Sequence, residues 1–416
     1  MKRFWPALLA AALLLAACSG VSPGEPSPSA SADPDEPVLT KRNIELTVWE
    51  RPGAGEEFIR QAAAVFNQKY PNIVIRCVGV EPGDIPGRVR DESERGGCAD
   101  LFLIPHTEIR ALADALLILP ARDQTKTKAA VFPVCAQAAS AGGAVFGYPV
   151  SAETVALFYN KRLFAEDEPP ASWEELVALA KGLNNGEQAG FVMPAGSVYY
   201  AFPFALTWNA RPFGPDGGDP DAFDFENVTT VEGMKVFKSL RAVSLPSEEL
   251  SPGAAARAFA SGKAAFCVAG LWDVRQFTEA GVSFGVAPLP AFPGGDHPSA
   301  SFASVGVMTV SAYSANPDEA SAFAALLLTE EMQKLRVELT GELPSSDITL
   351  RAPAYADGFM RQMEHAVPYP AFLPSSDFGR ALAVFEEAAA RIWDGADIGA
   401  ELAACSAARR PPERDG

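Results

Sequence analysis

The sequence holds few histidines and little positive charge. Its 416 residues include three histidines, which stand far apart, and no Cys-x-x-Cys pair among six cysteines. Metal sites need closely spaced Cys and His ligands, so we expect no metal and no cofactor. Lys and Arg number 34 against 52 Asp and Glu, which gives a formal net charge of -18. Because phosphate binding needs clustered Lys and Arg, we expect no nucleic acid partner.

Long apolar runs are absent after the first residues of the chain. Lys2 and Arg3 precede an apolar stretch at residues 4–17, which is too short to cross a bilayer and is typical of a signal peptide, here residues 1–17. The stretch ends in Leu-Ala-Ala-Cys18, which resembles the lipobox of bacterial lipoproteins. This resemblance implies lipidation of Cys18 and a lipid anchor at the extracellular face of the cytoplasmic membrane. A plain secretory cleavage site is the alternative.

The composition after Cys18 predicts three kinds of segment. Residues 18–42 are rich in Ser, Pro and Gly and cannot bury a core, so they read as the lipidated Cys and a flexible stalk. The following part of the chain is too large for one compact core, and with 48% apolar residues in the whole sequence it predicts two lobes. Residues 409–416 form a polar C-terminal tail.

The first part of the folded region alternates strands and helices. Residues 44–49 and 72–78 read as strands, separated by a helical pattern, and residues 100–104 form a fully apolar third strand. This order predicts an open parallel sheet, in which ligands gather at the carboxyl ends of the strands. We expect ligand contacts from the residues that follow two of these strands: Trp49, Glu50, Arg51, His106 and Thr107. The alternative for these side chains is a solvated strand end.

The most informative segment spans residues 147–185. An apolar run at residues 155–159 fits a strand buried on both faces, and Ser172 with Glu175 forms a capping box that opens a helix at Trp173. With Glu153 before the strand, this segment resembles the crossover of bacterial extracellular solute-binding proteins of the maltodextrin-binding type. The resemblance resumes at residues 256–345 and covers most of residues 44–408.

This resemblance implies the fold and the domain division. The fold class is α/β and periplasmic-binding-protein-like, with two lobes that each hold a mostly parallel sheet flanked by helices, joined by hinge strands. Lobe 1 would comprise residues 43–150 and 303–346. Lobe 2 would comprise residues 151–302 and 347–408.

The resemblance also implies a sugar site. Glu153 matches a carboxylate that accepts hydrogen bonds from sugar hydroxyls, Trp272 matches an aromatic platform, and Tyr199 with Tyr200 matches an aromatic pair of the sugar loop. A hinge salt bridge for Glu153 and core packing for Trp272 are the structural alternatives. The late tryptophan of the family has no match here, and Tyr369 or Phe378 would take its place.

Other positions depart from the maltodextrin-binding pattern. Thr107-Glu108 stands where those proteins carry Asp-Arg, and Ser197 stands where they carry Glu before the aromatic pair. These departures leave the identity of the sugar open.

Five cysteines follow Cys18: Cys77, Cys98, Cys135, Cys267 and Cys405. Outside the cell four of them could pair, and we expect a disulfide within lobe 1 among the first three, with at least one thiol free. The spacing does not determine the pairing.

The sequence thus predicts a non-enzymatic capturing protein. It would close around a small solute, most simply a sugar or oligosaccharide, and present it to the permease subunits of an ABC importer. Another small polar solute is one alternative, and an extracellular sensory clamp for a receptor kinase is a second. An enzyme would need a nucleophile, a base or a metal cluster that the sequence does not offer.

Overall fold

The computed structural model describes residues 39–164, 168–185, 188–206, 212–214, 219–350, 354–371 and 376–409. The predicted signal peptide, Cys18, residues 18–38 of the stalk and residues 410–416 of the tail lie outside this part of the chain. Among the described residues, no helix combines the length and apolar character that a membrane crossing needs.

The strands are β1 (Ile44–Glu50), β2 (Ile73–Gly79), β3 (Leu101–Pro105), β4 (Ser140–Ala141), β5 (Ala144–Val145), β6 (Tyr148–Asn160), β7 (Ala189–Val192), β8 (Ala264–Gly270), β9 (Phe284–Ala287), β10 (Ser301–Val310) and β11 (Ala366–Pro368). The helices are α1 (Ala54–Lys69), α2 (Ile85–Glu92), α3 (Ile109–Asp114), α4 (Gln124–Ala129), α5 (Pro133–Ala138), α6 (Trp173–Leu183), α7 (Val198–Ala205), α8 (Val228–Ser239), α9 (Pro252–Ala260), α10 (Val274–Glu279), α11 (Pro317–Leu326), α12 (Glu330–Thr340), α13 (Ala356–Met363), α14 (Asp377–Trp393) and α15 (Ile398–Ala408).

The first strands form the predicted parallel arrangement. β1 pairs in parallel with β2 on one side and with β3 on the other, so the carboxyl ends of β1 and β3 lie at one edge of the sheet. The connection between β1 and β2 is helix α1, which buries Phe58, Ile59 and Phe66. Such a crossover is what two parallel neighbours require.

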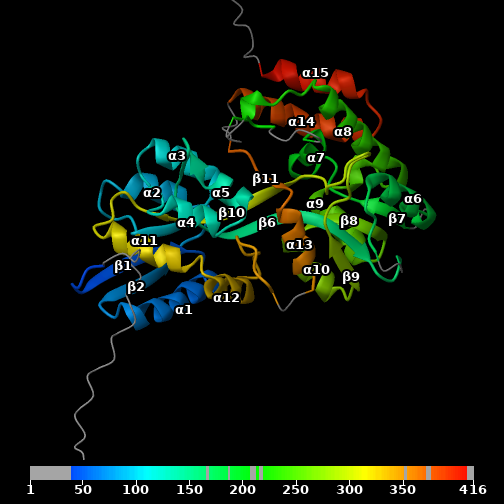
Figure 1. Ribbon diagram of the computed structural model, residues 1–416. Helices are drawn as coiled ribbons and strands as arrows, with labels where there is room; N and C mark the ends of the chain where they lie inside the picture. Colours follow the sequence, from blue (N-terminus) through cyan, green and yellow to red (C-terminus); the bar gives the residue numbers. More distant parts are fainter. Residues whose placement is uncertain are drawn as a thin grey trace, which may run out of the picture. The chain divides into compact units, whose positions relative to one another are not determined.

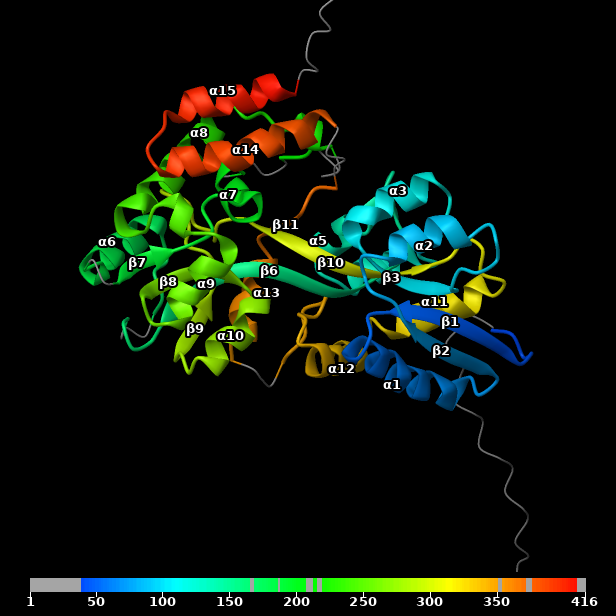
Figure 2. The ribbon, with the colours of Figure 1, turned by 180° about the vertical axis from the view of Figure 1, so that it is seen from behind.

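Two long strands, β6 and β10, run side by side through the middle of the fold (Figure 1 and Figure 2). β10 pairs antiparallel with β3, and the first half of β6 pairs with β10. The second half of β6 pairs instead with β8 and β9, and β8 continues in parallel to β7. The sheet order is therefore β2-β1-β3-β10-β6-β8-β7, with the antiparallel pairs of this sheet at the crossing strands.

The predicted caps are present with one difference. The Ser172 hydroxyl accepts from the Glu175 N–H at 3.2 Å and begins α6, as the sequence predicts. The Glu175 carboxylate, however, accepts from the N–H of Ala171 at 2.7 Å, one residue earlier than a capping box requires. Helix α12 ends at Gly341, whose φ of 74° lies in the left-handed region that favours glycine.

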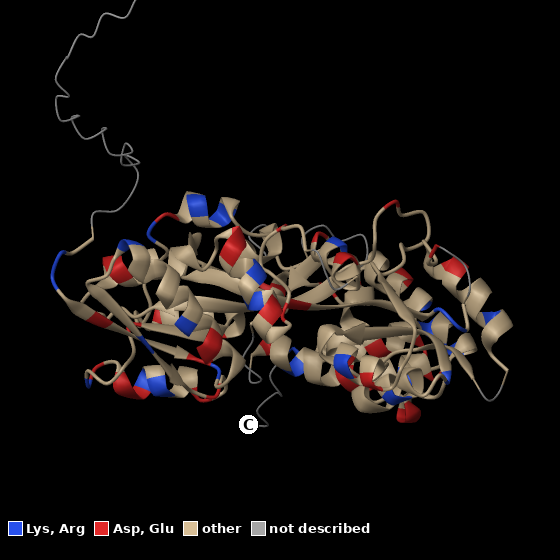
Figure 3. Ribbon diagram, turned by 90° about the horizontal axis from the view of Figure 1, so that it is seen from below, with Lys and Arg blue, Asp and Glu red and all other residues tan. Residues whose placement is uncertain are grey.

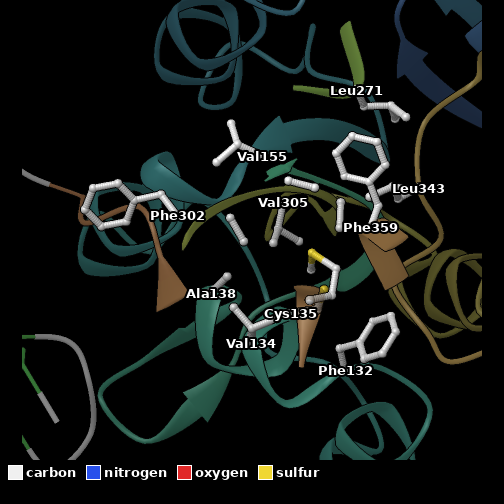
Figure 4. Packing of buried hydrophobic residues seen from close by; sticks show 14 of the residues in the cluster. Phe132, Val134, Cys135, Ala138, Val155, Leu271, Phe302, Val305, Leu343 and Phe359 are labelled. Atoms are coloured by element: carbon white, nitrogen blue, oxygen red, sulfur yellow. The ribbon is translucent and has the colours of Figure 1, made fainter. Parts of the chain in front are cut away.

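The buried core surrounds the crossing strands, with Val155, Val305 and Phe359 among its residues (Figure 4). Cys135 lies in helix α5 within this core and is fully buried. The expected disulfide is wrong in the structure, because Cys77, Cys98, Cys135, Cys267 and Cys405 are all free thiols. Cys135, Cys267 and Cys405 are buried and Cys77 and Cys98 are half-buried, and a buried thiol packs as a small apolar side chain without a partner.

The described residues from Leu39 onward form one compact unit by their contacts. The boundaries proposed for the two lobes therefore stay a prediction. Acidic and basic positions are interspersed over the helices on both sides of the crossing strands (Figure 3).

Candidate ligand-binding site

An aromatic wall lies where α7, β8 and β11 meet β10. We use this name for Tyr199, Trp272, Phe302 and Tyr369. The Tyr199 ring centroid lies 5.9 Å from that of Trp272, 5.9 Å from that of Phe302 and 5.7 Å from that of Tyr369. The Tyr199 hydroxyl donates to the carbonyl oxygen of Phe302 at 3.1 Å, which fixes the ring at the centre of the wall.

Trp272 is the exposed member of the wall. It follows β8 directly, and 46% of its surface is accessible, which is unusual for so large an apolar side chain. Its indole ring lies across the backbone of Gly270, so closely that a Cβ atom at residue 270 would overlap the ring. The glycine thus leaves room for a flat aromatic surface that faces solvent.

Glu153 lies on β6 opposite Ser304 of β10 and is only partly exposed. Burial raises the pKa of its carboxyl group, the Glu342 carboxylate raises that pKa further, and the Arg51 guanidinium partly opposes both effects. The Glu153 charge in turn acts on the Tyr199 hydroxyl, which places the carboxylate near the wall. Within the described part of the chain, no side chain or backbone group donates a hydrogen bond to the Glu153 carboxylate.

Arg51 supplies the nearby positive charge. Its Nη2 atom donates to Glu342 Oε1 at 2.7 Å, while 46% of its side chain remains accessible. The guanidinium is therefore already paired within the protein. It lies close enough to Glu153 to affect that carboxyl group without forming an ion pair with it among the described contacts.

A buried charge cluster supports this region from the core. We use this name for Glu50, Arg336 and Glu342. The Arg336 guanidinium donates to Glu50 Oε2 at 3.2 Å and to Glu342 Oε2 at 2.9 Å, and all three residues are nearly inaccessible. Burial alone would raise the pKa of Glu342, but the Arg336 and Arg51 guanidinium groups hold it below its usual value. Every charge of this cluster has a partner.

The structure brings together only some of the predicted ligand contacts. Glu153, Tyr199, Trp272 and Tyr369 come from separate parts of the chain and lie around the wall, with Arg51 close to Glu153. Thr107 is half-buried in the short 3-10 turn after β3, with no contact to the wall among the described interactions.

Other predicted contacts are packing or pairing residues. Trp49 is 2% exposed beneath the Arg88 guanidinium, which lies 4.2 Å from its ring, and Glu50 is fully buried against Arg336. Tyr200 is buried behind Tyr199. In this structure these three side chains present little or no surface to a solute, and their contacts with a ligand stay a prediction.

Phe378 and His106 also face the interior of the protein, and their contacts with a ligand likewise stay a prediction. Phe378 begins α14 inside an aromatic core that includes Phe202, 6.0 Å away by ring centroids. His106 is 5% exposed, and both of its ring nitrogens are bonded to backbone groups of the protein.

Sequence reasoning missed two residues that shape the site. Phe302 forms the base of the wall, and alternation along β10 places it on the same face as Ser304, opposite Glu153. Glu342 orients Arg51 and lies in the segment Gly341-Glu-Leu-Pro that resembles the family, which was the available signal. Among the described residues, no group of three His, Cys, Asp or Glu side chains could hold a metal ion.

Comparisons with known proteins identify the family of the chain. Two strand groups joined by crossing strands, with an aromatic wall and a carboxylate beside them, define a binding protein for a small solute. The model of the family described as bacterial extracellular solute-binding protein matches residues 61–358, and the chain belongs to this family.

Individual relatives share about a quarter of their residues with this chain. The chain is 27% identical over 352 residues to a galactooligosaccharide-binding protein of Bacillus subtilis (strain 168), covering 83% of this chain and 80% of the relative. It is 24% identical over 372 residues to a maltooligosaccharide ABC transporter solute-binding lipoprotein of Streptococcus pneumoniae (strain ATCC BAA-255 / R6), covering 86% and 82%. Among solved structures, it resembles a cyclo/maltodextrin-binding protein complexed with maltotetraose, with a TM-score of 0.80, 27% identity and coverage of 89% and 97%. The fold class predicted from the sequence is confirmed.

Proposed function

We propose that the protein captures a neutral oligosaccharide and presents it to the permease of an ABC importer. The observation that carries this proposal is a partnerless Glu153 carboxylate and an exposed Trp272 ring that both lie close to Tyr199. An indole face packs on the C–H face of a pyranose, while the hydroxyl groups at the edge of the sugar stay free for hydrogen bonds. A carboxylate can accept hydrogen bonds from two such hydroxyl groups, and these bonds are stronger than hydrogen bonds between neutral groups.

The charges of the site favour a neutral solute over an anion. Arg51 is already paired with Glu342, and Glu153 and Glu342 would repel a phosphate or carboxylate. The relatives whose names state a ligand bind galactooligosaccharides or maltooligosaccharides, which supports a sugar of two or more units. Sugar binding of this kind needs no chemistry, so we propose a protein without enzymatic activity.

The identity of the sugar is tested by calorimetry and thermal shift. The protein without residues 1–38 is titrated with maltotriose, maltotetraose and a galactooligosaccharide, with a polyol and an amino acid as controls. A sugar at a hundred times its dissociation constant should add about 2.7 kcal/mol to the free energy of unfolding. Binding of the polyol or the amino acid alone would replace the oligosaccharide by another small polar solute.

We also propose that binding closes two lobes with the boundaries predicted from the sequence. β6 and β10 link the two strand groups, so a rotation about these strands would bring lobe 1, with Arg51, toward Glu153 and Trp272 of lobe 2 around a bound sugar. Small-angle scattering should show a lower radius of gyration at saturating sugar. An unchanged profile at proven saturation would contradict closure.

Anchoring by lipid is the last part of the proposal. Its basis is the Leu-Ala-Ala-Cys18 motif, supported by a relative that is named as a lipoprotein. Cys18→Ala should release the protein from the membrane and leave sugar binding intact. Mass spectrometry that found an unmodified Cys18 at the mature start would contradict the anchor.

A further inference from the structure

His106 joins three segments of the sheet through its two ring nitrogens. It follows β3 directly, in the short turn His106–Glu108. The Val305 N–H of β10 donates to Nδ1 at 3.1 Å, and the Nε2–H group donates to the carbonyl oxygen of Tyr369 at 2.8 Å. Because a carbonyl oxygen only accepts and a backbone N–H only donates, both contacts together require the neutral imidazole with its proton on Nε2.

Tyr369 is the residue of the wall that this arrangement fixes. Its N–H donates to the Ala303 carbonyl oxygen at 2.9 Å, which continues the pairing of β11 with β10, and its carbonyl oxygen is held by His106. The N–H and the carbonyl oxygen of Tyr369 are thus both hydrogen-bonded, and its neighbours Pro368 and Pro370 restrict the backbone on either side. Its ring contacts Phe302 at 5.0 Å and Tyr199 at 5.7 Å by centroids.

We propose that His106 is a positioning residue for sugar binding: its Nε2–H bond sets the backbone of Tyr369 and so the place of the Tyr369 ring in the aromatic wall. The imidazole does this from a site that is 5% exposed, without a contact to the sugar. Under the proposed lobe boundaries, His106 belongs to lobe 1 and Tyr369 to lobe 2, so the bond also ties the two lobes together near the wall. This inference rests on the proposed function.

Two substitutions separate the two bonds of the ring. His106→Asn places its amide oxygen where Nδ1 lies, so it keeps an acceptor for Val305 and loses the donor to Tyr369. His106→Gln reaches the position of Nε2 with its amide N–H and keeps that donor. The two variants remove similar amounts of buried ring, so a purely structural role for His106 would give them similar effects on binding.

The experiment measures maltotetraose affinity by calorimetry and the exchange rate of the Tyr369 amide hydrogen by NMR without sugar. We expect His106→Asn to weaken binding by about tenfold and His106→Gln by less than about threefold, the range of one hydrogen bond. Amide exchange at Tyr369 should be faster in His106→Asn than in His106→Gln. In the wild type, nitrogen chemical shifts of the histidine ring should show the Nε2–H tautomer at pH 7.

Equal losses of affinity in the two variants, or wild-type affinity in folded His106→Asn, would overturn the proposal. A protonated ring or an Nδ1–H tautomer in the wild type would also overturn it. If the wild-type protein does not bind maltotetraose, that result contradicts the choice of sugar, and the Tyr369 exchange rates and the tautomer then decide the role of His106 by themselves.

Discussion

The buried charge cluster and Glu153 are two groups of carboxylates with opposite surroundings. Glu50 and Glu342 lie deep in the protein, and each accepts hydrogen bonds from the Arg336 guanidinium. Glu153 is also largely buried but has no hydrogen-bond donor among the described residues, and burial raises the pKa of its carboxyl group. A glutamate carboxylate therefore supports folding at Glu50 and Glu342, where it is paired, and lowers stability at Glu153, where it is not.

This difference is our reason for proposing that the ligand binds at Glu153. The attraction of a buried partner offsets part of the desolvation cost of a charge, whereas a desolvated charge without a partner is destabilising until something binds it. Proteins retain such groups where function needs them. The exposed Trp272 ring is a second feature that costs stability in the free protein, and it contacts Tyr199, on which the Glu153 charge also acts.

Arg336→Met should have the largest effect, and it tests whether the buried charge cluster stabilises the fold. Removing the guanidinium that bridges Glu50 and Glu342 leaves the buried Glu50 without its charged partner and Glu342 with Arg51 alone, so the free energy of unfolding should fall by about 3–5 kcal/mol in urea denaturation. The exposed Arg361, paired with Asp357 on α13, is the matched control, and Arg361→Met should change stability little. Equal stability of the two variants would show that the cluster is not structural.

Trp272→Ala tests the other side of the comparison. Truncating the exposed ring removes the proposed stacking surface, and we expect binding of maltotetraose to weaken by about 2–4 kcal/mol, as for a central aromatic anchor. Stability should change little, because nearly half of the side chain is already in contact with water. Unchanged affinity in a folded variant would return Trp272 to a packing role.

Gly270→Ala sharpens this result without touching the sugar. The new Cβ atom would overlap the indole ring, which must move because the backbone of β8 is held by its neighbours. We expect maltotetraose affinity to fall by about tenfold, or about 1.4 kcal/mol, with a shift in Trp272 fluorescence. Gly262→Ala, in the turn before β8, is the control. A Cβ atom at residue 262 would meet no other atom, but the φ of 73° disfavours alanine, so this variant should lower stability without moving the Trp272 ring. A loss of affinity in both variants would indicate a general effect on β8.

The strands were predictable where apolar residues alternate, as in β1, β2 and β3, and so was the start of α6 at Ser172. β6 extends back to Tyr148, further than the apolar run at residues 155–159 indicates, because pairing with β10 and not composition holds its first half in the sheet. Tyr199 and Trp272 came from the resemblance to the family, Tyr369 was named in place of a tryptophan that the family carries, and Phe302 was missed. The roles of Glu50 and His106 were not predictable.

The physical reason is distance along the chain. Glu50 and Arg336 are 286 residues apart, and His106 and Tyr369 are 263 apart, so nothing local marks either pair. Position at the end of a strand correctly places a side chain near the site. It does not tell whether the side chain faces the solute or turns into the core to bind another part of the protein.

The most direct test of the account compares Glu153→Gln with Glu50→Gln by urea denaturation without sugar. Glu153→Gln should raise the free energy of unfolding by up to about 1 kcal/mol at pH 7 and still weaken maltotetraose binding, because it removes a desolvated charge that the sugar needs. Because the pKa of Glu153 is raised in the folded state, the folded protein binds more protons than the unfolded chain at a pH between the two pKa values. Wild-type stability should therefore fall as the pH rises from the ordinary carboxyl pKa through the raised one, and Glu153→Gln should lose this pH dependence. Glu50→Gln should instead lower stability, since Arg336 loses a charged partner. If Glu153→Gln lowered stability as Glu50→Gln does, Glu153 would be a structural carboxylate and the account would be wrong.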